Sequence, residues 1–151
     1  MTETLETSAK PAATAPAHMT ASSTPSGAGL AQQVVVNGRH TILTDEPERL
    51  GGLDAGPTPH ELLPAALASC VATMVAMYAR NRGWEIGEPS VRVDYDPAST
   101  PRRAVVELQL PPGLSPDQRA RLERVASTCP LRRALEAGFE FEERTTETLA
   151  A

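Results

Sequence analysis

Hydrophobic and polar positions along this chain follow two periods, one typical of strands and one typical of helices. Two β-prone runs flank Asn37-Gly38, a pair that strongly favours a hairpin turn because both of its positions need a positive φ. We therefore expect a hairpin over residues 32–43. Further alternating runs predict strands at 90–95, 103–110 and 139–144.

The longest apolar run predicts a helix from Thr58 to about residue 81. Thr58 is a good N-cap, Pro59 suits the first helical position, and Glu61 completes a capping box. Apolar side chains cover most of the circumference, so we expect this helix to pack against its own sheet on one side and a second subunit on the other. Pro64 removes one helical hydrogen bond at a cost of about 3 kcal/mol, which predicts a kink or a late start.

Residues that are typical of helix ends predict where the other helices begin and end. Gly83 ends the long helix, Ser115 begins a second one, and Cys129-Pro130 begins a third that Gly138 ends. The order ββ-α-ββ-αα-β predicts an α+β fold, in which an antiparallel or mixed sheet wraps around a long central helix.

Composition divides the chain into a tail and one domain. Residues 1–29 are rich in Ala, Thr, Ser and Pro, can bury little apolar surface, and are predicted to be disordered. Residues 30–151 are predicted to form the single domain. No secretory signal is recognisable at the start, and polar residues and proline interrupt the long apolar run. We therefore expect a cytoplasmic protein with no membrane partner.

The net charge argues against a nucleic-acid partner, and the spacing of histidines and cysteines argues against a metal site. The formal net charge is −5 and arginines are interleaved with glutamates, so we expect no nucleic-acid partner. His40 and His60 are candidate acid–base groups, although a histidine at an exposed helix start is usually only solvated. Neither these histidines nor the cysteines have the local spacing of a metal site, so we expect no metal and no cofactor.

Cys70 and Cys129 are the only cysteines, and they lie 59 positions apart. A cysteine in an alanine-rich helix is usually a small core residue, and a cysteine before Pro130 can be a purely structural cap. If the fold brings the two together, they form a thiol–disulfide redox centre. The helix N-terminus would lower the pKa of Cys129, whereas burial would raise the pKa of Cys70.

Three motifs follow one another in a specific order. They are GPTPHELL at 56–63, Cys70 nine residues after Glu61, and the distant Cys129-Pro130 pair. With these motifs the chain resembles the OsmC/Ohr family, and its OsmC-like branch in particular, over about residues 33–145. The resemblance implies an OsmC-like fold, an intertwined homodimer with two sites at its interface, and thiol-dependent reduction of organic hydroperoxides.

The resemblance also implies a role for each matched residue. Cys70 would be the peroxidatic cysteine, whose thiolate attacks the peroxide, and Cys129 the resolving cysteine that forms the disulfide. Glu61 would match the family's glutamate, which in Ohr proteins orients an arginine that stabilises the thiolate. That arginine comes from a segment upstream of the hairpin, and here no arginine precedes the hairpin.

Arg39, beside the hairpin turn, is the earliest arginine and the candidate substitute; the alternative is a solvated turn residue. Glu61 also has a structural explanation in the capping box. Nine helical positions give about 13.5 Å of rise and about half a turn, so Glu61 cannot touch Cys70 on one straight helix. It could act on a thiol site only across the dimer or through a bend at Pro64.

Two functions therefore remain open. The first is a thiol peroxidase for oxidative-stress defence, in which Cys70 becomes a sulfenic acid, Cys129 captures it as a disulfide, and an external dithiol reduces the pair. The second is a non-peroxidase dimer of the same fold that binds a small apolar ligand at its interface. The missing arginine and the apolar central helix motivate the second.

Overall fold

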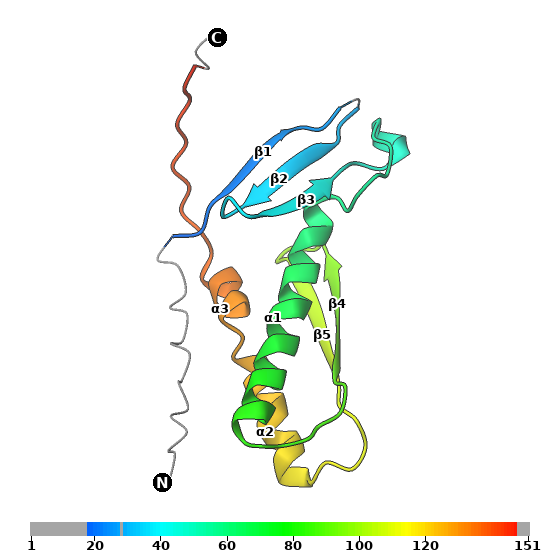
Figure 1. Ribbon diagram of the computed structural model, residues 1–151, viewed down its shortest axis with the longest axis vertical. Helices are drawn as coiled ribbons and strands as arrows, with labels where there is room; N and C mark the ends of the chain where they lie inside the picture. The colour runs from blue at the N-terminus through cyan, green and yellow to red at the C-terminus, as the bar shows by residue number, and fades with distance from the viewer. Residues whose placement is uncertain (1–17, 28, 148–151) are drawn as a thin grey trace, which may run out of the picture. The chain divides into compact units, whose positions relative to one another are not determined.

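A computed structural model describes residues 18–27 and 29–147 (Figure 1). The chain forms two compact units, which divide between Pro57 and Thr58.

The first unit is a three-stranded antiparallel sheet in the order β1-β2-β3, formed by Ala21–Pro25, Gln32–Val36 and His40–Thr44 (Figure 1). Val36 pairs with His40, so Asn37 and Gly38 fall near the turn of the β2–β3 hairpin. Their φ angles are 50° and 65°, the left-handed values that such a turn requires. The predicted hairpin is confirmed.

Strand β1 lies inside the segment that we expected to be a disordered tail, so the structure differs from that expectation at residues 21–25. All five of its side chains are exposed, and the strand is held by its backbone ladder to β2. Backbone pairing leaves no trace in hydrophobic periodicity, because the backbone N–H and C=O groups that form the ladder are the same in every residue except proline, which has no N–H. Residues 1–17 and 28 lie outside the described part of the chain.

The loop after β3 is organised by one buried carboxylate. Asp45 is 2% exposed, and its oxygens accept hydrogen bonds from the backbone N–H groups of Glu46, Leu53 and Ala55 at 2.8, 2.9 and 3.2 Å. A Cβ on Gly52 would lie 1.7 Å from the carbonyl oxygen of Glu46, so only glycine can occupy that position without a backbone shift. A short 3₁₀ helix, Glu48–Leu50, lies within the loop.

The second unit is built on α1, which runs from Pro59 to Asn81. Thr58 accepts a hydrogen bond from the N–H of Glu61, and the Glu61 carboxylate accepts one from the N–H of Thr58, so the predicted capping box is confirmed. The helix continues through Pro64, which excludes the late start. It is long and apolar enough to cross a membrane, with a mean hydropathy of 1.8, contrary to our expectation; core helices of soluble proteins share that property.

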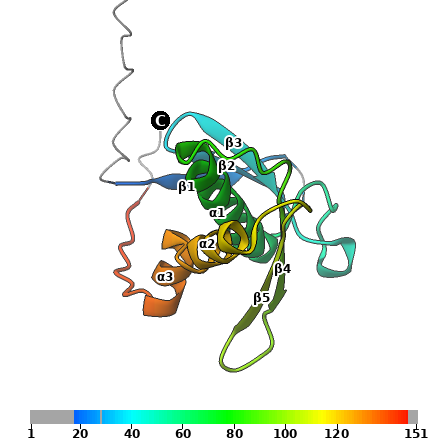
Figure 2. The ribbon, with the colours of Figure 1, turned by 90° about the horizontal axis from the view of Figure 1, so that it is seen from below.

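Strands β4 (Ser90–Asp96) and β5 (Arg103–Gln109) form an antiparallel hairpin, and α2 (Pro116–Ser127) and α3 (Pro130–Ala137) follow. These elements confirm the predicted strands and helices. Helix α1 contacts β4, α2 and α3. Seen from below, α3 and the β4–β5 hairpin flank α1 and α2 on different sides (Figure 2). A stripe at four-residue spacing on α1 is buried by this packing: Leu67, Val71, Val75 and Ala79.

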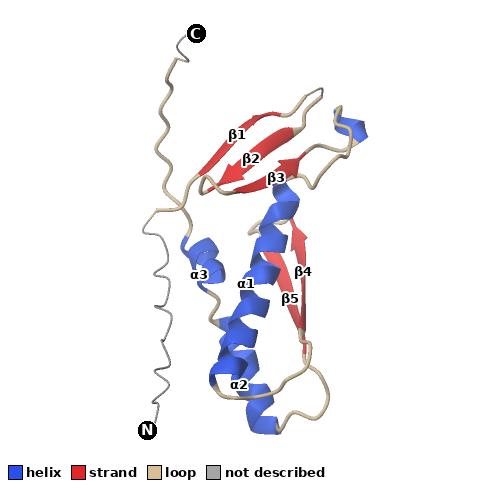
Figure 3. Ribbon diagram, in the orientation of Figure 1, coloured by secondary structure: helices blue, strands red, loops and turns tan. Residues whose placement is uncertain are grey.

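The predicted last strand at 139–144 is wrong. Residues 138–147 are drawn as loop, and none of them is assigned to a strand or helix (Figure 3). The alternation of phenylalanine and charge is real, but no strand edge in the described chain pairs with it. Phe139 and Phe141 are consequently 63% and 87% exposed.

The architecture is therefore α+β, with a long helix and antiparallel sheets. All strand pairs within 18–27 and 29–147 are antiparallel, so the mixed-sheet alternative finds no support there.

Candidate active site

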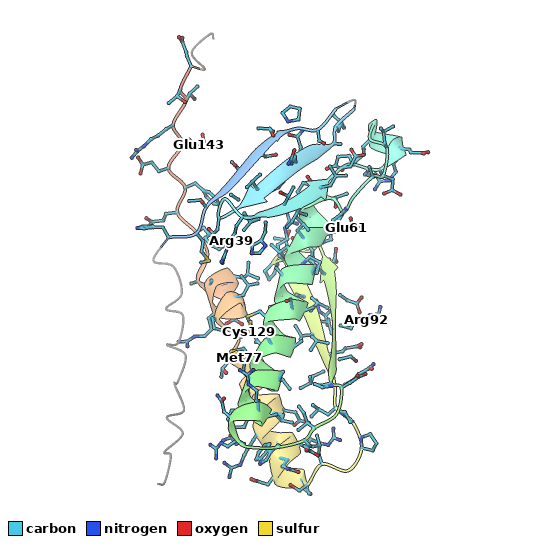
Figure 4. The ribbon with its side chains drawn as sticks, in the orientation of Figure 1. Arg39, Glu61, Met77, Arg92, Cys129 and Glu143 are labelled. Carbon is cyan, nitrogen blue, oxygen red and sulfur yellow. The ribbon has the colours of Figure 1, made fainter. Side chains whose placement is uncertain are left out.

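The two cysteines come together in the second unit. Cys70 lies in the middle of α1. Cys129, labelled in Figure 4, is the N-cap of α3, which contacts α1. Their Sγ atoms are 2.6 Å apart, and both cysteines are free thiols. The distance joins residues 59 positions apart in the chain, so only the tertiary fold brings them into contact.

The surroundings of the pair are apolar. Cys129 is 0% exposed and forms a buried cluster with Leu67 and Val71 of α1. Other partly buried side chains close the cluster: Cys70, Val91, Val93, Val106, Ala126 and Leu131. Cys70 is only partly buried, so it is the more accessible of the two sulfurs. A small reactant can therefore reach Cys70 more readily than Cys129.

Burial raises the pKa of the Cys70 thiol, and the hydrogen bond with Cys129 raises it further. The backbone N–H of Leu131 opposes both effects, because it donates to the sulfur and stabilises the thiolate. The prediction that burial raises the pKa of Cys70 is confirmed. Cys129 caps α3 by its backbone position, and its side chain makes no capping hydrogen bond.

Glu61 is not brought to the cysteine pair by its own helix. It is exposed at the N-terminus of α1, nine positions before Cys70, and its carboxylate is engaged in the capping box (Figure 4). The described contacts of Glu61 therefore support its role in the helix cap.

Arg39 is exposed in the first unit, where its N–H donates to the carbonyl of Val36 at the hairpin turn. The cysteine pair belongs to the second unit. His40 and His60 are both exposed. Across 18–27 and 29–147, no three His, Cys, Asp or Glu side chains form a group that could hold a metal ion.

Sequence reasoning missed a cavity of about 630 Å³ in the second unit, lined by residues of α1, β4, β5, α3 and the segment after α3. Leu67 and Val106 belong both to this lining and to the cysteine cluster. The lining also includes the basic side chains Arg102, Arg103 and Arg132. The sequence gives one indication that a basic side chain lies near the cysteines, because Arg132 follows Cys129 by about one helical turn.

A smaller cavity of about 310 Å³ lies on Val71, Val106 and residues of α2. Arg132 lines both cavities, and its Nε lies 2.8 Å from a carboxylate oxygen of Glu136. The cysteine cluster thus shares its apolar side chains with two cavities.

Comparison with known proteins places this arrangement in a family. The sequence pattern of the family described as OsmC-like protein matches residues 51–144, and no curated protein sequence matches the chain. A proposed osmotic stress induced and detoxification response protein from Psychrobacter arcticus is 25% identical, with a TM-score of 0.63 over 75% of this chain and 85% of that one.

Two further solved structures show the same fold at lower identity. The organic hydroperoxide resistance protein OsmC from Legionella pneumophila is 20% identical, with a TM-score of 0.55 over 81% of this chain and 91% of that one. An OsmC-like protein of unknown function from Vibrio cholerae is 14% identical, with a TM-score of 0.58 over 78% and 93%. The fold is OsmC-like, and the chain belongs to the OsmC-like protein family, which includes hydroperoxide-resistance proteins.

Proposed function

We propose that this protein is a thiol peroxidase that reduces organic hydroperoxides to alcohols in oxidative-stress defence. The observation that carries the proposal is the contact between two free thiols, with Sγ atoms 2.6 Å apart, in a member of a family that includes hydroperoxide-resistance proteins. A catalytic pair needs one sulfur that the peroxide can reach and a second sulfur close enough to form a disulfide with the oxidised first one. Cys70 is partly exposed and Cys129 is buried, so the two meet these needs in that order.

The reaction has three balanced steps. The Cys70 thiolate attacks the terminal peroxide oxygen, the O–O bond breaks, and the alkoxide leaves and takes up a proton to become the alcohol. Sulfur is oxidised to the sulfenic acid while the peroxide is reduced by the same two electrons. Cys129 then attacks the Cys70 sulfur, so that the disulfide forms and water leaves. An external dithiol reduces the disulfide by exchange and is itself oxidised.

The large cavity supports an organic substrate. Most of its lining side chains on α1 and the β4–β5 hairpin are apolar, and it shares Leu67 and Val106 with the cysteine cluster. An apolar group of a hydroperoxide gains free energy from burial there, about 25 cal/mol for each Å² removed from water. Hydrogen peroxide has no such group and gains nothing.

We further propose that the protein works as a homodimer. Cys70, Met74 and Met77 lie on one face of α1 at helical spacing, and Met77 is 45% exposed. An apolar helix face of this kind is typical of an interface. In a dimer, Glu61 and Arg39 of one subunit could act on the thiol site of the other subunit.

The test is turnover with a dithiol reductant, comparing cumene hydroperoxide with hydrogen peroxide. We expect turnover that favours the organic peroxide, because only it has a group to bury. Cys70→Ser should abolish turnover, and Cys129→Ser, with the dithiol left out, should stop after one oxidation with a trappable sulfenic acid. Full activity of Cys70→Ser, with an unchanged circular dichroism spectrum, would disprove the assignment.

A second function has one observation in its favour. The cavity of about 630 Å³ is large enough for a small apolar ligand, and burial disfavours the Cys70 thiolate that a peroxidase needs. Under this alternative the protein is a dimeric binding protein. Native mass spectrometry of the purified protein would then detect a bound small molecule, and peroxide consumption would be absent.

A further inference from the structure

The cavity of about 630 Å³ in the second unit has a mostly apolar lining and an excess of positive charge. Leucine, valine, alanine, proline and phenylalanine residues of α1, the β4–β5 hairpin and the α3 region supply most of that lining. Its ionisable residues are Tyr95, Arg102, Arg103, Arg132 and Glu136. Three arginines are set against one glutamate, although the whole chain has a formal net charge of −5. The cavity therefore concentrates cations beside apolar side chains.

The Arg102 guanidinium is held in place without losing its charge. It donates hydrogen bonds to the backbone carbonyls of Pro97 and Ser99, the latter at 3.3 Å. A carbonyl oxygen has no formal charge, so these bonds position the guanidinium but do not neutralise it. Within residues 18–27 and 29–147, Arg102 forms no ion pair with a carboxylate. Its charge is therefore available to attract an anion into the cavity.

Arg132 supplies a second cation from α3. Its Nε lies 2.8 Å from a carboxylate oxygen of Glu136, one helical turn further on. An arginine has several N–H donors, and in the described part of the chain this contact is the one hydrogen bond of the Arg132 side chain. The N–H groups of its terminal nitrogens therefore remain for a ligand. Arg132 also lines the smaller cavity, together with Val71 and Val106 of the cysteine cluster.

We propose that this cavity binds an organic anion, a molecule with an apolar body and one carboxylate or sulfonate group, and that Arg102 and Arg132 bind the charged group. A guanidinium has paired N–H donors that match the oxygens of such a group. The apolar body gains free energy when it leaves water for the lining. An inorganic anion would not use the apolar lining, and a neutral molecule would not use the arginines. If the protein is a peroxidase, a consequence that rests on the proposed function, its substrates are hydroperoxides that carry such an anionic group.

The test compares two fluorescent probes that share their aromatic rings. Anilinonaphthalene sulfonate has an anionic group, and phenylnaphthylamine is its neutral counterpart. Each probe is titrated into the reduced full-length protein, and the ratio of the two Kd values isolates the contribution of the charge. We expect Arg132→Gln and Arg102→Gln each to weaken sulfonate binding about fivefold relative to the neutral probe, because each removes one partly exposed ion pair with the ligand.

Glu136→Gln should change the affinity in the opposite direction. The substitution removes the carboxylate that competes for Arg132 and keeps the size of the side chain. We expect sulfonate binding to strengthen about threefold relative to the neutral probe. General damage to the fold would not produce a gain of this kind.

The matched control is Arg133→Gln. Arg133 is exposed on α3 beside Arg132 but lies outside the cavity lining, and its loss changes the net charge by the same amount. It should keep the Kd ratio within about twofold of the wild type, as surface substitutions usually do. Circular dichroism checks the fold of each variant. If Arg102→Gln does not fold, because its guanidinium also holds two loop carbonyls, the variants at Arg132 and Glu136 decide the question.

Equal Kd ratios in Arg132→Gln, Glu136→Gln and Arg133→Gln would overturn the anion site. Turnover extends the test to the substrate, with cumene hydroperoxide compared with its para-carboxylate. The preference in kcat/KM for the carboxylate should fall about fivefold in Arg132→Gln and persist in Arg133→Gln, and an equal preference in both would reject anionic hydroperoxides as the substrates. If neither peroxide is consumed while the probes respond as expected, the proposed function fails and the anion site stands. Consumption of both peroxides with no response of the probes would reject the anion site and leave the peroxidase.

Discussion

Cys70 and Cys129 differ in what surrounds each sulfur, and that difference assigns their proposed roles. Cys70 is partly exposed on α1, whereas Cys129 is fully buried at the start of α3. A nucleophile must meet its substrate, while a resolving cysteine needs only to meet the oxidised nucleophile. The described contacts therefore favour Cys70 as the sulfur that reacts first.

The pH dependence of the reaction follows from the pKa of Cys70. Burial and Cys129 raise that pKa, so the thiolate is the minor form near neutrality. We expect the single-turnover rate of peroxide consumption to rise with pH from 6 upward, about tenfold for each pH unit, until the thiol is ionised. A rate that is flat between pH 6 and 8 would show that another group lowers the pKa of this thiol.

Asp45 gives a residue-scale prediction for stability. The N–H of Leu53 and then those of Glu46 and Ala55 hold its pKa below the ordinary 3.8, against the effect of burial. A carboxyl whose pKa is lower in the folded state stabilises above its unfolded pKa, and this contribution is lost as the pH falls through the folded pKa. Asp45→Asn should therefore lower the melting temperature at pH 7, with a smaller difference from wild type near pH 3.

The control for this prediction is Asp54→Asn, which changes an exposed aspartate of the same loop with a φ of 52° that asparagine tolerates. It should melt within about 1 °C of wild type, as surface substitutions usually do. Equal melting temperatures for Asp45→Asn and Asp54→Asn at pH 7 would contradict the role given to the buried carboxylate.

Helix α1 gives the prediction at the scale of an element. Pro64 lies inside the helix, where it cannot donate to the carbonyl of His60, whereas Pro59 lies at the first position, which needs no donor. Pro64→Ala should stabilise the protein by about 1 to 3 kcal/mol, and Pro59→Ala should change its stability by less than about 0.5 kcal/mol. Guanidinium denaturation measures both. Equal stability of the two variants would contradict this account.

Elements were predictable where local chemistry specifies them. Asn37-Gly38 marked the hairpin, the capping box at Thr58 marked one helix, and Ser115 marked the start of another, because each signal acts within four residues. Strand β1 was missed because all of its side chains are exposed and its pairing with β2 is mainly through the backbone. The segment 139–144 was misassigned because alternation alone does not provide a strand edge to pair with.

The whole-molecule prediction concerns the dimer. Sedimentation should give about twice the 16.0 kDa mass of one chain, because we propose that the exposed Met77 face of α1 packs against a second subunit. Met77→Glu should shift the protein toward the monomer, since the new charge would lose its water at the interface. Arg119→Gln makes the same change in net charge at an exposed position of α2 and should remain dimeric. A monomeric wild type at micromolar concentration would contradict the dimer.

The site was predictable only in part at this scale. The cysteines could be identified because thiols carry their chemistry in the sequence and the motifs around them are specific. The contact between them, the Leu131 donor and the arginine-lined cavity depend on how α1, β5 and α3 pack, and no local pattern encodes that packing. The catalytic role that the family motif suggests for Glu61 stays a prediction, because the described contacts of its carboxylate are those of the capping box.

The most direct measurement is mass spectrometry of the pre-reduced protein after one equivalent of cumene hydroperoxide, with peptide mapping of the cysteines. The account predicts a loss of two hydrogens and a Cys70–Cys129 disulfide, formed faster than with hydrogen peroxide. Two thiols that remain reduced, or cysteines that oxidise separately without a bond between them, would contradict the peroxidase and leave a binding protein of the OsmC-like family.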